Sequence, residues 1–499
     1  MAERCALGID LGTSSCKVCI VSSEGRLLGV AGSSYPILTP HSGWSEQDAR
    51  EWMPALERAF ARLWATLDSS RPEISTIALS SAAHIPVLLG EKDEPLRPAI
   101  LWNDVRSGKE AAQLNAEMGP RIFAQTCNQA STTWTLPQLL WVKMHEPEVW
   151  RRVRRICLSK DYLFYQLTGR FVTDPGMAVS SLLYDAHRQR WSDDLCVRLE
   201  ISPSILPNVA PVAIAAGKLL PAVADRLRLP RELPVMLGTL DSVAETYSTG
   251  ALSAGACVIR LGTGGGVQLL RPGPVGHPQL ISYPFPVADL WLSQAATNAC
   301  GASLQWAARG LGLPSPDALS QLAECSPVGA AGVLFHPYLS GERTPYWDPD
   351  LRGSFVGLSL MHQPEHLARA VLEGIAYSLK DAFSVFCDDP SGWAVSSMTI
   401  LGGGAKSATL TPILCDVFAQ PVRVDPDADS AYGAALLAMD STGGPVRVAR
   451  EGTVALMPDA GASRYYAQRF VDYRWIADRM RDFYRRPQGN EHSNRSEGK

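Results

Sequence analysis

Short apolar runs separated by turn residues open the chain and predict β-strands. Three of these runs occupy residues 6–10, 17–22 and 26–33. The pattern then changes from about Ala49, because apolar side chains recur at helical spacing at Trp52, Leu56, Ala59, Leu63 and Leu67. Residues 77–80 and 84–90 return to strand-like runs. Strands that give way to a helix and then return predict an α/β layer fold.

A strand, a Gly-Thr turn and a second strand occur twice along the chain. The first copy carries Gly12-Thr13, and the second, after residues 256–261, carries Gly262-Thr263. The repeat predicts two related lobes, with residues 1–248 in the N-terminal lobe and 249–484 in the C-terminal lobe. Residues 485–499 are polar and poor in apolar side chains, so we expect them to form a disordered tail.

Composition then narrows the classes of function. Of the 499 residues, 46% are hydrophobic and 19% charged, and the net charge is −4. Such a chain has no bulk basic field for nucleic acid or an anionic membrane. It also lacks an uncharged apolar stretch of roughly 18 residues that would predict a membrane span. The eleven cysteines are scattered, as is typical of reduced thiols, so we expect a cytoplasmic protein.

Glycine turns are the first candidate chemistry. A tight turn between two strands exposes consecutive backbone N–H groups, which bind anions. Two such turns, each with a threonine hydroxyl, predict a polyphosphate held across a cleft. A third cluster, Gly402-Gly403-Gly404, follows a strand pattern and favours a phosphate or a close approach of adenosine. It lacks P-loop spacing, and no Gly-x-Gly-x-x-Gly follows the first strand, which disfavours a dinucleotide-binding dehydrogenase.

Two carboxylates and one mixed segment add to this picture. Asp10 directly precedes the first glycine turn, so a divalent cation would have to separate it from phosphate; the alternative is an Asp that caps the turn. Asp241 follows the apolar run 233–240 at the lobe boundary, and its alternative is a helix N-cap. Residues 101–106 combine an aromatic ring, an amide, a carboxylate and a guanidinium, which suits a sugar site or a surface turn.

Longer motifs give a specific resemblance. The segment 339–381 reads Leu-Ser-Gly-Glu-Arg-Thr-Pro-Tyr-Trp-Asp-Pro and continues into a helix pattern through 370–377. Further pieces follow in the same order: Gly-Ile-Asp-Leu-Gly-Thr-Ser at 8–14, Trp-Ser-Glu-Gln-Asp at 44–48, Ile-Leu-Trp-Asn-Asp at 100–104 and Ser-Lys-Asp-Tyr-Leu at 159–163. Together they resemble the FGGY carbohydrate kinases over nearly the whole chain, and within that family the pattern is most like the xylulokinases.

The resemblance implies two actin-like, ribonuclease-H-like lobes that close on ATP, Mg²⁺ and a sugar. It implies transfer of the γ-phosphate of ATP to a hydroxyl of a ketose, with Asp241 as the catalytic base and Asp10 near the metal. It implies sugar contacts at His84, Trp102, Asp104, Asp241 and Ser242. It implies nucleotide contacts at Gly12, Thr13, Ser14, Lys17, Gly262, Thr263, Gly264, Gly403 and Gly404. A homodimer is implied by the family alone.

Departures from the xylulokinase pattern concern the sugar pocket and one turn. The chain reads Ala82-Ala83-His84-Ile85 where xylulokinases carry Gln-Met-His-Gly, and Ser242 where Asn is usual. Gly264 stands where Ser is common. The substrate is therefore D-xylulose or another ketose, a polyol or an aldonate.

Two other classes of function share parts of the pattern. An actin-like or chaperone ATPase has the two glycine turns but lacks the 101–106 and 339–381 segments. A silent sugar-binding regulator has no need of Asp10, Thr13, Thr263 and Asp241 together.

Overall fold

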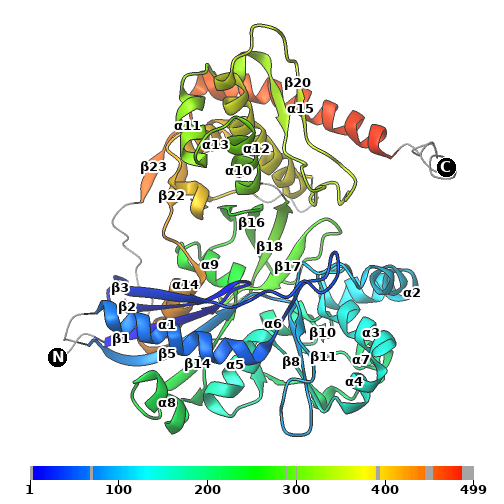
Figure 1. Ribbon diagram of the computed structural model, residues 1–499, viewed down its shortest axis with the longest axis vertical. Coiled ribbons are helices and arrows are strands. Elements are labelled where there is room, and N and C mark those ends of the chain that lie inside the picture. Colours follow the sequence, from blue (N-terminus) through cyan, green and yellow to red (C-terminus); the bar gives the residue numbers. More distant parts are fainter. Residues whose placement is uncertain are drawn as a thin grey trace, which may run out of the picture.

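The computed structural model describes residues 4–67, 71–212, 214–287, 289–298, 300–388, 394–443 and 453–485. Its strands form two large sheets, one in each of two lobes (Figure 1). The α/β fold and the two-lobed arrangement expected from the sequence are confirmed. Of the expected tail, residues 486–499 lie outside the described residues.

A six-stranded sheet forms the centre of the first lobe. In spatial order its strands are β13 (Ala215–Lys218), β14 (Pro234–Leu240), β5 (Glu73–Ser81), β1 (Arg4–Leu11), β2 (Ser15–Ser22) and β3 (Leu27–Ser34). Strand β5 runs parallel to both β1 and β14. The carboxyl ends of these three strands therefore meet at one edge, where α/β sheets place their ligand-binding loops.

Helices and short strands surround this sheet. Helix α1 (Trp52–Thr66) buries Trp52, Leu56, Ala59 and Leu63, which confirms the predicted helical face, while Ala49–Glu51 form a 3₁₀ turn before it. Residues 84–90 contain β6 (Pro86–Leu89), which pairs with β8 (Arg155–Leu158) outside the main sheet. The other elements are β4 (Glu46–Gln47), β7 (Ala99–Ile100), β9 (Val172–Thr173), β10 (Tyr184–Asp185), β11 (Arg190–Trp191), β12 (Asn208–Val209), α2 (Gly108–Thr126), α3 (Thr135–His145), α4 (Pro147–Arg152), α5 (Ser159–Thr168), α6 (Pro175–Ser180), α7 (Asp193–Leu199), α8 (Pro221–Leu227) and α9 (Asp241–Ser248).

The second lobe repeats the plan with seven strands. Their order is β17 (Ile281–Pro284), β18 (Leu290–Thr297), β16 (Gly265–Pro272), β15 (Ala256–Leu261), β21 (Ser397–Leu401), β22 (Val422–Asp425) and β23 (Val454–Leu456). The remaining elements are α10 (Gly301–Gly310), α11 (Pro316–Glu324), β19 (Leu334–His336), β20 (Ser354–Val356), α12 (Pro364–Cys387), α13 (Leu410–Phe418), α14 (Ser430–Gly443) and α15 (Ala460–Tyr484). As in the first lobe, the leading hairpin β15–β16 is antiparallel and β15 pairs parallel with β21.

Helix α14 crosses from the second half of the chain to the first lobe, where it packs on β1, β5 and α9 (Figure 1). The approach is close because one glycine lies on β1 and another on α14 itself. A Cβ on Gly8 would lie 1.8 Å from the carbonyl oxygen of Ala431, and one on Gly433 would lie 1.9 Å from that of Ala244. The two lobes therefore share a helical junction that side chains at these positions would force apart.

Among the described residues, we find no helix both long enough and apolar enough to cross a membrane.

Candidate active site

A cavity of about 480 Å³ lies between the lobes. Eight of the residues predicted from the sequence line it: Thr13, Ser14, His84, Trp102, Asp241, Ser242, Thr263 and Gly264. They come from the turn after β1, the loop after β5, the loop after β7, the start of α9 and the turn after β15. Two halves of the chain thus supply one site, because the strand ends of each sheet point into the same cleft.

The first glycine turn is held by the predicted aromatic segment. The indole Nε1 of Trp102 donates to the Thr13 hydroxyl at 2.9 Å, and the Gln47 side-chain amide donates to the Thr13 carbonyl. Within the turn, the Gly12 N–H donates to the Ser15 carbonyl at 3.0 Å. Trp102 is therefore both a wall of the cleft and a positioning contact for Thr13.

Asp10 does not cap this turn. Its carboxylate accepts from the Ser80 hydroxyl at 2.6 Å, and its Oδ2 lies 3.5 Å from where a Cβ on Gly12 would be. Burial raises the pKa of Asp10 to about 6, partly opposed by the Ser80 hydrogen bond and increased by the charge of Asp429. The carboxylate thus lies next to the glycine turn but does not line the cavity itself.

Asp241 is the first residue of α9 and not its N-cap, which is Leu240. Its carboxylate accepts from the Ser242 N–H at 2.7 Å and faces the cleft. Burial and the nearby charge of Asp10 raise the pKa of Asp241 to about 7, although Arg260 lowers it. A carboxyl group with this pKa can accept a proton at neutral pH.

A buried network fixes the strand that leads to Asp241. Lys160 Nζ lies 3.0 Å from Asp174 Oδ1 and donates to the Leu237 carbonyl at 3.2 Å. Asp174 Oδ2 in turn accepts from the Thr239 hydroxyl at 3.1 Å. The Ser-Lys-Asp motif at 159–161 therefore holds the end of β14 two residues before Asp241.

His84 forms the opposite wall with a residue from the other lobe. Its Nε2 lies 2.7 Å from the Tyr283 hydroxyl, and its Nδ1 lies 2.8 Å from the Ser180 carbonyl. Because a carbonyl can only accept, Nδ1 carries the proton and Nε2 accepts from Tyr283. Burial lowers the pKa of His84 to about 4, so the ring is neutral at physiological pH.

The second glycine turn is tied to helix α10 and flanked by two arginines. The Gly301 N–H donates to the Gly262 carbonyl at 2.9 Å, and the Cys300 N–H donates to the Thr263 carbonyl at 3.1 Å. Arg260 and Arg343 both line the cleft beside this turn. The turn therefore combines glycine backbone, a threonine side chain that lines the cleft and positive charge.

Several predicted residues lie outside the cavity lining. Lys17 faces Asp10 across the β1–β2 pair and forms an ion pair with Asp429 at 3.2 Å. Gly12 and Gly262 belong to the turns themselves, and Gly403 and Gly404 start a 3₁₀ turn beside Leu261. Space beside Gly403 is open, because a Cβ there would meet no atom within 4 Å.

Asp104 is also placed elsewhere. Its carboxylate is buried and accepts from the Ser45 N–H at 2.6 Å and from the Arg106 guanidinium at 2.7 and 2.9 Å. Arg106 also contacts Glu46 at 2.6 Å and stacks over the ring of Trp44. This network supports the loop that carries Trp102, so the contribution of Asp104 to a sugar site stays a prediction.

The lining residues that were not predicted from the sequence include four with ionisable side chains: Glu245, Arg260, Tyr283 and Arg343. Glu245 could have been found, because it stands four residues after Asp241 on one helical face. Arg260 is a lone charge in an apolar strand, and Arg343 belongs to the Gly-Glu-Arg motif already noted. Tyr283 gives no local signal, since it enters the cleft through strand pairing far along the chain.

No group of three or more His, Cys, Asp or Glu side chains is placed to hold a metal in the described parts of the chain. The arrangement nevertheless fits a magnesium ion carried by a polyphosphate. Mg²⁺ takes one or two protein carboxylates and completes its shell with phosphate oxygens and water. Asp10 and Asp241 lie close enough for the charge of Asp10 to raise the pKa of Asp241.

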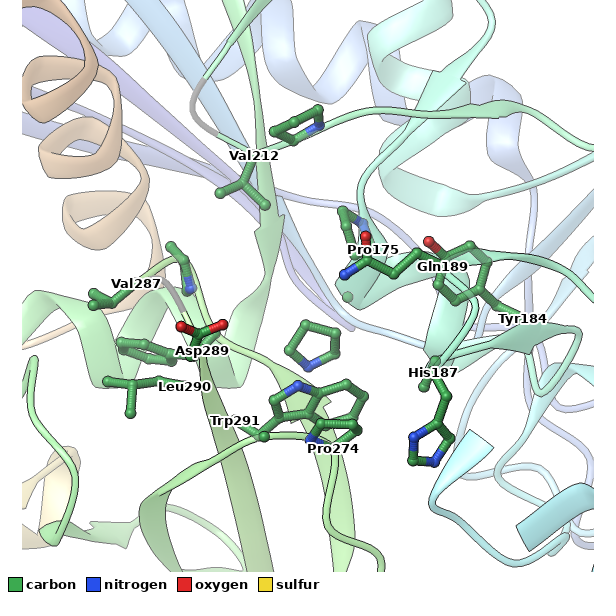
Figure 2. A pocket seen from close by; sticks show the side chains of 17 residues that line it. Pro175, Tyr184, His187, Gln189, Val212, Pro274, Val287, Asp289, Leu290 and Trp291 are labelled. Atoms are coloured by element: carbon green, nitrogen blue, oxygen red, sulfur yellow. The ribbon is translucent and has the colours of Figure 1, made fainter. Parts of the chain in front are cut away.

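A second cavity, of about 460 Å³, lies where α6 and the loop after β10 meet β17 and β18 (Figure 2). Tyr184 and Trp291 line it together with several prolines, and Asp289 contributes its one carboxylate. Its described lining contains neither of the two Gly-Thr turns and only one carboxylate. The interlobe cleft is therefore the candidate active site.

Comparisons with known proteins agree with this geometry. The model of the FGGY family of carbohydrate kinases matches with its N-terminal domain at residues 5–247 and its C-terminal domain at 257–441. A xylulose kinase of Lactococcus lactis is 34% identical over 436 residues, 87% of each chain. One of Escherichia coli is 32% identical over 485 residues, 96% of this chain and 98% of that one. The crystal structure of xylulose kinase from Rhodospirillum rubrum superimposes with a TM-score of 0.87 at 28% identity, covering 96% of this chain and 99% of that one.

Proposed function

The chain belongs to the FGGY family of carbohydrate kinases, and we propose that it transfers the γ-phosphate of ATP to a hydroxyl of D-xylulose, forming D-xylulose 5-phosphate. The actin-like, two-lobed fold of the family suits this reaction, because lobes that close on both substrates exclude water. The observation that carries the proposal is the Asp241 carboxylate, which faces the cleft with a pKa of about 7.

Asp241 would act as the general base. A sugar hydroxyl is a weak nucleophile at neutral pH, and its proton must leave as the new P–O bond forms. A carboxylate in hydrogen-bond reach orients the hydroxyl and accepts this proton. Its pKa near 7 suits the task, since the group is largely ionised at slightly alkaline pH yet basic enough to take the proton.

The sugar would lie between Trp102, His84 and Asp241. Trp102 supplies a ring face for the C–H surface of a sugar, and Ser242 supplies a hydroxyl beside the base. Ala83 also lines this region, whereas Ala82 is 1% exposed and packs in the core. Ala83 is smaller than the Met that xylulokinases carry at this position. Substrates longer than D-xylulose are therefore worth testing as well.

The nucleotide would lie along the glycine turns. Thr13 and Thr263 would donate to phosphate oxygens, and the open space beside Gly403 would accept the adenosine. Asp10 would hold Mg²⁺, which supplies charge neutralisation for the phosphates when bound. Burial raises the pKa of Asp241, and the charges of Asp10 and Glu245 raise it further, so these carboxylates would repel a phosphate that carried no cation.

A coupled assay of ADP release tests the proposal directly. The purified chain is incubated with MgATP and each of D-xylulose, D-ribulose, erythritol and D-gluconate, and the phosphorylated product is identified by mass spectrometry and NMR. The proposal predicts the highest kcat/KM with D-xylulose and phosphate at its 5-hydroxyl. A higher kcat/KM with another sugar would replace the substrate, and ADP release that no sugar stimulates would remove the kinase activity itself.

We also propose a cytosolic location and a homodimeric state. The first is supported by the eleven cysteines, all of which are free thiols. The second rests on the family resemblance, and sedimentation of the purified chain would test it.

A further inference from the structure

We propose that Arg260 and Arg343 together bind the phosphoryl group that is transferred, as the γ-phosphate of ATP before the reaction and as the phosphate of the sugar product after it. The inference rests on the proposed kinase function and adds two binding residues to it. Its basis is the placement of two guanidinium groups on either side of one glycine turn.

Burial lowers the pKa of Arg343 and the charge of the neighbouring Glu342 raises it, but no carboxylate forms an ion pair with this guanidinium among the described residues. Arg343 lines the cleft, its Nη2 donates to the Thr297 carbonyl at 2.9 Å, and its Nε is buried with no hydrogen-bond partner among the described residues. No ion pair to Arg343 occurs in the described chain, because the adjacent Glu342 carboxylate instead accepts from the backbone N–H groups of Asn298 and Arg343. A guanidinium placed in this way is costly unless an anion joins it.

Arg260 approaches the same turn from the other side. Its Nε donates to Glu245 at 2.6 Å, while 42% of its side chain is exposed and faces the cleft. Glu245 holds the guanidinium by one edge, so N–H groups remain for a ligand, since Arg carries five in a fixed fork. The ion pair with Glu245 therefore orients Arg260 toward the cleft and leaves other N–H groups of its guanidinium available.

The glycines between the arginines explain their approach. A Cβ on Gly262 would lie 3.2 Å from Arg260 Nη1, and one on Gly264 would lie 3.4 Å from Arg343 Nη2 and 2.8 Å from the Thr297 carbonyl oxygen. A serine at position 264, which is common in the family, would therefore crowd this carbonyl. Gly264 leaves room for the guanidinium beside Thr263.

Charge favours a phosphate as the occupant. Arg260 lies close enough to Arg343 to lower its pKa further, after the larger effect of burial. Two repelling cations beside backbone N–H groups form a site for a multiply charged anion such as a phosphate, two of whose oxygens a guanidinium can bind through paired hydrogen bonds. Burial and the charge of Asp241 raise the pKa of Tyr283 and Arg343 lowers it, so Arg343 and the base Asp241 both lie near this ring.

The proposed reaction is an in-line transfer of the γ-phosphoryl group. The sugar oxygen forms a bond to Pγ, and the bond from Pγ to the bridging oxygen of ADP breaks with its electron pair on ADP. The hydroxyl proton passes to the Asp241 carboxylate. Throughout, the two arginines contact the non-bridging oxygens of the moving group, where negative charge is spread.

Binding of MgATP and MgADP to Arg343→Lys, Arg343→Gln and Arg260→Lys, measured by isothermal titration calorimetry, tests the assignment. Because these arginines touch the γ-phosphate alone, affinity for MgATP should fall roughly 10- to 100-fold while affinity for MgADP stays within about twofold. The kcat should fall at least as much. Arg231→Lys, at an exposed ion pair with Asp225 outside the cleft, is the matched control and should change neither.

Equal losses for MgATP and MgADP, or no loss for either, would overturn the assignment. Arg343→Lys keeps the charge and should fold even where Arg343→Gln does not, so it decides the result in that case. The binding comparison needs no sugar and no turnover. The binding comparison therefore still tests the two arginines if the sugar screen gives no product. Failure of the arginine assignment can thus be told apart from failure of the proposed function.

Discussion

At Asp241, burial and neighbouring charge adjust a single carboxyl group to the chemistry it would perform. Asp241→Asn keeps the shape of the side chain but removes its basicity. We expect kcat to fall roughly 10²–10⁴-fold, the usual scale of general-base catalysis, with nearly unchanged affinity for MgATP. Steady-state kinetics beside calorimetry measure both quantities, and Asp225→Asn, at an exposed ion pair on α8, is the control. A kcat near the wild-type value would show that Asp241 is not the general base.

The same carboxyl group predicts opposite pH dependences for activity and stability. Activity needs the ionised form, so kcat/KM should fall as pH decreases through about 7. The folded chain keeps a proton on Asp241 up to about pH 7, whereas an unfolded Asp loses it near 3.8, so this group lowers the free energy of unfolding as pH rises through that window. Asp241→Asn should therefore raise Tm more at pH 8 than at pH 5. Thermal unfolding at both values checks this, and a larger gain at pH 5 would contradict it.

Ala83 is the residue at which we expect substrate choice to change. Its side chain lines the cleft, so Ala83→Met adds apolar volume beside the sugar, whereas the buried Ala82 has no room for a larger group. The ratio of kcat/KM for D-xylulose over longer substrates should rise by roughly tenfold, the scale of one or two methylenes in a pocket. Competition assays measure the ratio, with Ala222→Met on the exposed surface of α8 as the control. An unchanged ranking of sugars would rule out Ala83 as a determinant.

The sequence predicts which residues belong to the site where the local strand pattern and the chemistry of the side chain agree. Asp10 lies at the end of an apolar strand and Thr13 and Asp241 follow one, so the sequence pattern predicts their place at strand ends. The surroundings of Asp104 could not be predicted in this way. The sequence does not show that Asp104 forms an ion pair with Arg106 of the same segment. The same holds for Tyr283, since its meeting with His84 depends on how two distant loops pack.

At the scale of elements, the hairpins β1–β2 and β15–β16 were predicted because glycine turns and apolar runs mark their ends. The packing of α14 on the first sheet could not be, since it joins residues more than 400 positions apart. The three-dimensional structure explains the glycine at position 8 of β1, because it lets the backbone of α14 approach.

Gly8→Ala should therefore destabilise the chain. Its Cβ would lie 1.8 Å from the Ala431 carbonyl oxygen, so α14 and β1 must separate. Overpacking of this kind costs roughly 1–3 kcal/mol, or more where backbone must move, and the lower stability should appear as a lower Tm. Gly310→Ala, where a Cβ meets no atom within 4 Å, is the control and should leave Tm unchanged or slightly higher. Equal Tm values for the two variants would show that the junction is not tightly packed.

At the scale of the whole molecule, the cleft depends on contacts that cross between the two halves of the chain. His84 lies after β5 in the first lobe, and Tyr283 lies on β17 of the second sheet. Other crossing contacts, such as Lys17 with Asp429, are partly exposed and screened by salt. The hydrogen bond between His84 and Tyr283 is buried, so salt does not weaken it. It connects the sugar side of the cleft in one lobe to a strand of the other lobe.

Tyr283→Phe tests this connection at the level of the assembled site. The ring and its packing against Trp134 remain, but the buried Nε2 of His84 loses its donor, a loss of roughly 1–3 kcal/mol. Because His84 lines the sugar side of the cleft, the KM for the sugar should rise, while the affinity for MgATP, bound along the glycine turns, should stay near wild type. The pKa of about 4 keeps His84 neutral in both proteins, so the change in KM should not vary between pH 6 and 8. A parallel loss of MgATP affinity would mean that the hydrogen bond holds the lobes together as a whole, and an unchanged KM would mean that the sugar does not depend on this wall.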